Sequence, residues 1–205
     1  MKFVLFCEGH TEKKALPAFL KRWLDTQLSQ PVGIATVRFD GWRDLYDRAP
    51  KKAQLRLKET DVISVISLLD LYGPTFYPDH LTAASERYDW AKKHMEERVG
   101  QDNFRQFFAV HEVEAWLLSD LTLFPKEIKS GFPGKAKNPE TVNFNEPPAK
   151  LLDRLYGDRL KRSYKKVTQG KELFDRLSPE TARNKCPRLT EMLDEMLKLA
   201  KAAGL

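Results

Sequence analysis

Short apolar runs alternate with longer amphipathic stretches over the first 120 residues, and this alternation restricts the fold more than any other feature. Mostly apolar residues fill positions 3–7, 32–39, 62–69 and 104–110, as expected for strands buried on both faces of a sheet. The run at 62–69 is the clearest, because it is rich in β-branched residues. Since a helical pattern follows each strand, the sequence predicts an α/β fold with a mostly parallel central sheet flanked by helices.

The intervening helices are predicted from apolar residues at three- and four-residue steps, clearest between positions 16 and 28. Pro17 is expected to kink that helix or to lie near its start. Pro50 interrupts the next connection, so we expect its helix to cover only residues 51–58. Further helices are predicted at 82–99 and from residue 112 to 118.

The second half of the chain changes character. Residues 130–148 are rich in Gly, Pro and Asn, a composition typical of a loop or lid. Helical patterns follow at 149–156, 171–177 and 187–202. We therefore expect residues 1–125 to form the α/β domain and residues 126–205 to form a basic loop and helical extension packed on it.

The residue content of the sequence argues against several classes of protein and site. The two cysteines, Cys7 and Cys186, belong to no paired spacing, which argues against a disulfide framework, a zinc finger or an iron–sulfur site. The longest apolar run has eight residues, far fewer than the roughly 20 that cross a bilayer. No signal-peptide pattern opens the chain. The sequence predicts a cytoplasmic protein with no membrane partner.

The positive charge is concentrated in one stretch. The formal net charge is +6, and residues 126–176 hold thirteen basic and seven acidic residues, so the remainder is neutral. Within this stretch lies the basic segment, which consists of Arg159, Lys161, Arg162, Lys165 and Lys166. Such a segment can bind nucleic-acid phosphates, and Tyr164 could stack on a base. The alternative is a solvated helix face.

Acidic residues follow every predicted strand. They are Glu8 and Glu12 after the first, Asp40 after the second, Asp70 after the third, and Glu112 and Glu114 after the fourth. The carboxyl ends of parallel strands meet at one edge of a sheet, where ligands bind. Carboxylates gathered there repel one another unless cations neutralise them, and oxygen ligands suit Mg²⁺ or Mn²⁺. The alternative is that each acid caps a helix N-terminus.

Other motifs fit less well. The segment around Gly9 lacks the glycines of a dinucleotide fingerprint and any phosphate-binding loop ending. Ala115 stands where a zinc protease needs its second His. Asp70 resembles the nucleophile of haloacid-dehalogenase-like phosphatases, but Tyr72 replaces the acid expected two residues later. That phosphatase activity remains the weaker alternative.

Three segments together carry a closer resemblance. They are Cys7-Glu8-Gly9-His10-Thr11-Glu12, Asp70-Leu71-Tyr72, and His111-Glu112-Val113-Glu114-Ala115-Trp116. With them the chain resembles an uncharacterised bacterial family with a Toprim-like fold, through the Pro-rich loop to Tyr164-Lys165-Lys166 and Cys186-Pro187-Arg188. That family is similar to the Toprim nuclease domains of the OLD group and is often encoded beside ATPases in phage-defence operons.

The resemblance implies a metal site. In Toprim enzymes a Glu after the first strand and an Asp-x-Asp after the third hold Mg²⁺ beside the scissile phosphodiester. Glu8 matches that Glu and Asp70 the first Asp, while Tyr72 stands in the place of the second Asp. We expect one or both of Glu112 and Glu114 to complete the site. Glu12 is expected to bind a second metal ion or to lie in the outer shell.

Two functions therefore remain in view. One is a Mg²⁺- or Mn²⁺-dependent nuclease acting on DNA or RNA, in which Glu8 is the general acid or base. His111 would shuttle a proton or orient Glu114, unless it only makes a structural hydrogen bond. The other is a non-catalytic binding subunit of an ATPase complex, favoured by Tyr72. The nuclease function leaves open whether an ATPase partner binds the chain, and both functions leave open whether it forms a homodimer.

Overall fold

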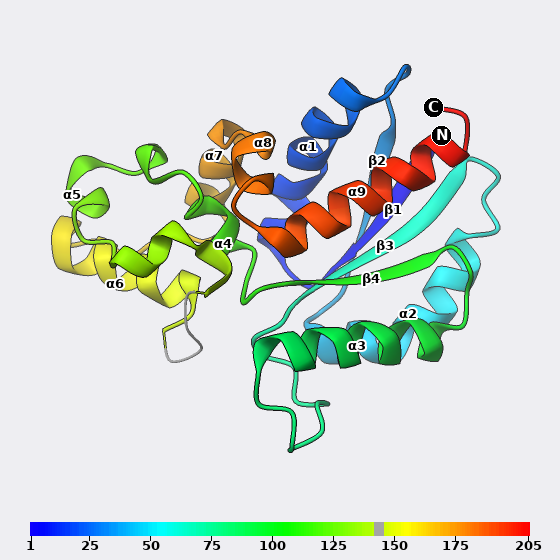
Figure 1. The fold of residues 1–205 in the computed structure, drawn as a ribbon, viewed down its shortest axis with the longest axis horizontal. Helices are drawn as coiled ribbons and strands as arrows, with labels where there is room; N and C mark the ends of the chain where they lie inside the picture. Colours follow the sequence, from blue (N-terminus) through cyan, green and yellow to red (C-terminus); the bar gives the residue numbers. More distant parts are fainter. Residues whose placement is uncertain (142–145) are drawn as a thin grey trace.

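The computed structural model describes residues 1–141 and 146–205, and its centre is a parallel four-stranded sheet (Figure 1). The strand order is β2-β1-β3-β4, and all three pairings are parallel. The strands are β1 (Lys2–Cys7), β2 (Gly33–Arg38), β3 (Val62–Asp70) and β4 (Phe104–Ala109). The predicted α/β fold with a parallel sheet flanked by helices is confirmed.

The sheet separates two apolar layers. Alternate residues of β1 point to opposite faces, so Phe3 and Leu5 join one cluster of buried side chains while Val4 and Phe6 join the other. The first face is covered by α1 (His10–Gln27) and α9 (Pro187–Ala202), and the second by α2 (Trp42–Arg56) and α3 (Ala84–Val99) (Figure 1). Burial on both faces explains why these strands read as continuous apolar runs.

Two prolines lie inside helices. Pro17 lies inside α1, and Pro50 lies inside α2. The helix α2 therefore begins at Trp42, nine residues before the predicted start at Lys51. The buried side chains of Leu45, Ala49 and Ala53 carry its contact with the sheet, and this packing outweighs the cost of a proline in the helix.

The second half consists mainly of short helices, and several of them lie beyond the carboxyl ends of the strands (Figure 1). They are α4 (Glu114–Leu117), η1 (Leu121–Leu123), α5 (Lys126–Lys129), η2 (Gly134–Lys137), η3 (Pro139–Thr141), α6 (Pro148–Leu160), α7 (Thr168–Arg176) and α8 (Pro179–Arg183). The predicted loop at 130–148 thus contains two 3₁₀ turns, and its residues 142–145 lie outside the described part. Across residues 1–141 and 146–205, no helix is long and apolar enough to span a membrane.

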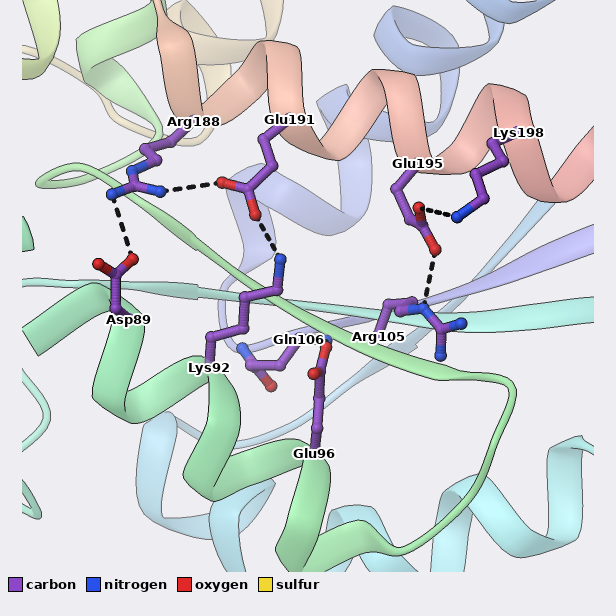
Figure 2. Close-up of polar contacts among 9 residues, drawn as sticks. All are labelled: Asp89, Lys92, Glu96, Arg105, Gln106, Arg188, Glu191, Glu195 and Lys198. Atoms are coloured by element: carbon purple, nitrogen blue, oxygen red, sulfur yellow. Dashed lines mark hydrogen bonds and ion pairs between the residues drawn. The ribbon is translucent and has the colours of Figure 1, made fainter.

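Charged side chains join α9 to α3 across the edge strand β4 (Figure 2). Arg188 of α9 pairs with Asp89 of α3 at 3.3 Å, and Glu191 pairs with Lys92. Farther along, Arg105 of β4 pairs with Glu195 at 2.9 Å. We call these ion pairs, together with Lys198, the α3–α9 network. They fix the last helix of the chain over a sheet edge that would otherwise be open.

Candidate metal and nucleic-acid site

The carboxyl ends of β1, β3 and β4 meet as predicted, and hydrogen bonds join them. Glu8 follows β1, and its Oε1 accepts a hydrogen bond from the backbone N–H of Asp70 at 3.2 Å. Asp70 ends β3, and its Oδ1 accepts one from the backbone N–H of Val113 at 3.1 Å. Three segments that are distant in sequence are thereby held at one place. We call Glu8, Glu12, Asp70, Glu112 and Glu114 the acid cluster.

Glu12 reaches this edge because Gly9 leaves room for it. A Cβ atom at position 9 would lie 2.0 Å from Glu12 Oε2 and 2.8 Å from its carboxyl carbon. The Glu12 side chain is 4% exposed, and its Oε2 has no hydrogen-bond partner in the described structure. Gly9 itself has an extended backbone, with φ of −114°. The requirement for glycine is therefore one of space and not of a positive φ angle.

Glu114 lies deepest in the acid cluster and faces a lysine. Its side chain is 0% exposed, and Lys166 Nζ lies 3.2 Å from its Oε2. Neither carboxyl oxygen has a hydrogen-bond partner within the described residues. The ion pair with Lys166 is therefore what compensates this buried charge.

The structure separates Glu112 from Glu114. Glu112 Oε2 accepts a hydrogen bond from the backbone N–H of Ala149 at 2.8 Å, in the first turn of α6. It therefore acts as a cap for that helix, which is the alternative considered for each acid. The α4 helix begins at Glu114, so the two carboxyls leave the chain on either side of a helix start. Glu114 is the one that lies next to Lys166.

His111 is 4% exposed at the start of this turn. Burial lowers its pKa to about 4, so the ring is neutral at neutral pH. Its backbone carbonyl accepts a hydrogen bond from the N–H of Tyr72 at 3.0 Å. A neutral ring can accept a proton only as a weak base. The structure thus places the backbone of His111 beside Tyr72, and the role of its ring in proton transfer stays a prediction.

Burial disfavours negative charge at three residues of the acid cluster, Glu8, Asp70 and Glu114. It raises the pKa of Glu8 to about 7, against the backbone hydrogen bond from Asp70. It raises the pKa of Glu114 to about 7 as well, although Lys166 opposes the shift. For Asp70, burial raises the pKa well above the usual range, with Glu12, Glu8 and Glu114 adding to the shift and Lys166 opposing it. These three acids share one buried site, where the positive charge of Lys166 only partly offsets the effect of burial.

Lys166 pairs with Glu114 and lies close enough to Asp70, Glu112 and Glu12 to interact with their charges. Burial alone would lower its pKa, but the charges of Glu114, Asp70, Glu112 and Glu12 together raise it. Its position follows from close packing of α7 on α1, because a Cβ atom at Gly170 would lie 3.2 Å from Thr11 Cγ2. This contact holds the turn that carries Lys166 beside the first turn of α1.

The rest of the basic segment has a different environment. Arg159, Lys161, Arg162 and Lys165 are all exposed. Lys166 is half-buried and its ammonium group lies beside Glu114. The adjacent residues Lys165 and Lys166 therefore have different environments. Tyr164 is 7% exposed, with its ring centroid 5.5 Å from that of Tyr156. The prediction that Tyr164 stacks on a base is therefore wrong, because the ring belongs to the core.

The donor atoms suit a hard divalent cation. They are carboxylate oxygens, and the buried oxygens of Glu114 together with Glu12 Oε2 have no hydrogen-bond partner among the described side chains. In the arrangement seen here, however, no three of the described His, Cys, Asp and Glu side chains converge so as to hold a metal ion. Tyr72 is 36% exposed where the resemblance calls for a second Asp. The residues fit a metal ion in chemistry, but side chains must move to bind it.

Comparisons with known proteins give a family for this chain. The family described as "Domain of unknown function (DUF4276)" matches residues 7–197. None of the curated proteins matches the sequence. The C-terminal region of the Burkholderia pseudomallei OLD protein is similar in structure, with 18% identity, coverage of 97% of both chains and a TM-score of 0.49. That of the Xanthomonas campestris pv. campestris OLD protein has 17% identity, coverage of 98% of this chain and 97% of the other, and a TM-score of 0.44.

Proposed function

The chain belongs to the DUF4276 family, whose function is unknown, and from its site we propose that it hydrolyses phosphodiester bonds of nucleic acid with Mg²⁺ or Mn²⁺. The observation that carries this proposal is the contact between the two halves of the site. Lys166 belongs to the basic segment and also pairs with Glu114 of the acid cluster at 3.2 Å. A nucleic-acid backbone bound along the exposed cations would therefore pass the buried carboxylates.

In this proposal the residues of the acid cluster have distinct roles. Glu8, Asp70 and Glu114 would hold the metal ion, with Glu12 behind them as an outer ligand or second-ion ligand. When bound, such an ion polarises a phosphate and lowers the pKa of a bound water. Glu8 would hold or release the proton in the step. Its carboxyl is already oriented by the backbone N–H of Asp70.

The exposed cations would bind substrate without reading its sequence. Arg159, Lys161, Arg162 and Lys165 are exposed and would contact phosphates in DNA or RNA. Each lost contact should lower the salt dependence of binding by about 0.9 in the slope of log affinity against log salt for duplex DNA. Lys165→Ala should therefore weaken binding and flatten its salt dependence.

The test is cleavage of single- and double-stranded DNA and RNA by purified protein with Mn²⁺. Wild type should cleave at least one substrate, and Asp70→Asn should not, while both should bind it comparably. Cleavage that survives Asp70→Asn would place the activity elsewhere or in a contaminant. Failure of wild type to cleave any substrate, with or without a co-encoded ATPase, would overturn the proposal.

A second function is favoured by one specific observation. Within the described residues, the acidic side chains make internal contacts and no three converge on an ion. Such an arrangement would also suit a non-catalytic subunit that binds nucleic acid or an ATPase. Binding of nucleic acid that is unaffected by EDTA, together with absence of cleavage, would favour this function.

A further inference from the structure

The place of Lys166 points to an exchange of cations within the site. Its ammonium group is paired with Glu114 and feels the charges of Asp70, Glu112 and Glu12. We propose that Lys166 is the internal counter-ion of the acid cluster in the metal-free protein, and that it must withdraw before a divalent cation can bind. This inference rests on the metal site of the proposed function and adds to it the group that controls access to that site.

Lys166 and Glu114 differ in their freedom to move. Glu114 is 0% exposed and begins the short helix α4, whose four residues are all buried. Lys166 lies in the turn before α7, and 38% of its side chain is exposed. Rotation about the lysine side-chain bonds can therefore carry the ammonium group to solvent. Because the buried side chain of Glu114 has no comparable route to solvent, Lys166 is the residue that moves.

The exchange also accounts for the arrangement of the other carboxylates. Asp70 and Glu8 accept backbone hydrogen bonds, and no three ligating side chains of the described chain converge. A single positive charge cannot neutralise several buried carboxylates, whereas a divalent ion supplies twice that charge at one point. Two cations in the same cluster would repel each other. Metal binding should therefore compete with Lys166.

Calorimetric titration with Mn²⁺ at pH 8 tests this competition, because carboxylates bind a metal ion in their deprotonated form. Lys166→Met removes the charge and keeps much of the side-chain volume, and Lys165→Met is the matched control at the exposed neighbour. We expect Lys166→Met to bind Mn²⁺ at least tenfold more tightly than wild type. Lys165→Met should bind Mn²⁺ as tightly as wild type does, because Lys165 is exposed and is assigned only to nucleic-acid phosphates. Equal binding by wild type and Lys166→Met would overturn the exchange while leaving the metal site intact, and no binding by either would overturn both.

A measurement on wild type keeps the inference testable if Lys166→Met does not fold. Amine acetylation followed by peptide mass spectrometry reports how accessible each lysine is. In EDTA, Lys166 should react several-fold more slowly than Lys165, and Mn²⁺ should speed its acetylation while leaving Lys165 unchanged. A rate at Lys166 that stays the same or falls when Mn²⁺ is added would overturn the exchange.

Discussion

The acid cluster and the α3–α9 network hold similar numbers of charges in opposite arrangements. In the network the signs alternate, so that Glu191 lies between Lys92 and Arg188, and Glu195 between Arg105 and Lys198 (Figure 2). In the acid cluster, carboxylates gather around Lys166. Paired, partly exposed charges need no ligand to be stable. Crowded buried carboxylates do, and this contrast distinguishes a structural network from a candidate site.

Substituting one carboxylate in each region should give the largest difference. Glu8→Gln removes a proton-transfer group and should lower cleavage by more than about 100-fold, with little loss of nucleic-acid binding. Glu191→Gln makes the same chemical change in the α3–α9 network and should leave cleavage within about twofold of wild type. Gel assays with Mn²⁺ measure both. An equal loss of cleavage in the two variants would mean that the contrast between the regions does not reflect function.

Space at Gly9 offers a second test of the acid cluster. Gly9→Ala places a Cβ atom 2.0 Å from Glu12 Oε2, so the carboxyl must move or the backbone must shift. We expect a loss of about 1–3 kcal/mol in the free energy of unfolding. Gly157→Ala, exposed in the last turn of α6 with nothing within 4 Å of the new Cβ, should instead stabilise by about 0.5–1 kcal/mol. Urea unfolding of both variants measures these effects. If Gly9→Ala leaves the free energy of unfolding unchanged, the side chain of Glu12 is free to move aside.

Glu140 lies next to the α3–α9 network but resembles the acid cluster in its pKa. Burial raises that pKa to about 7, against the backbone N–H groups of Arg188 and Leu189 at the start of α9. A carboxyl whose pKa is higher in the folded state stabilises the protein fully below its unfolded value, near 4.5. That stabilisation is lost as the pH rises through about 7.

We therefore expect wild type to lose about 1 kcal/mol relative to Glu140→Gln between pH 5 and pH 8, after allowance for partial exposure of the carboxyl. Urea unfolding at several pH values gives this difference directly. Because the other buried acids are present in both proteins, their contributions cancel. A constant difference between the two proteins would contradict the raised pKa of Glu140.

Periodicity in the sequence predicts the sheet and the edge at which Glu8, Asp70 and Glu114 meet, because strand burial and parallel pairing are local and regular properties. The contact between Lys166 and Glu114 could not be predicted from sequence periodicity. Lys165 and Lys166 are chemically identical neighbours, and only the packing of α7 on α1 makes one exposed and the other a partner of Glu114. The early start of α2 at Trp42 has the same origin, since tertiary packing overrides the local effect of Pro50.

The smallest expected effect is the coupling within the α3–α9 network. Lys92 and Glu191 form an ion pair with side chains 26% and 34% exposed, and exposed pairs of this kind contribute about 0.2–1 kcal/mol. A double-mutant cycle with Lys92→Met and Glu191→Gln, measured by urea unfolding, should give a coupling energy in that range. The coupling should shrink as salt is added, because solvent and ions reach the pair. A coupling well above 1 kcal/mol that resists salt would mean that the network is electrostatically as enclosed as Glu114 and Lys166. The difference in burial between the two regions would then not determine how strongly their ion pairs are coupled.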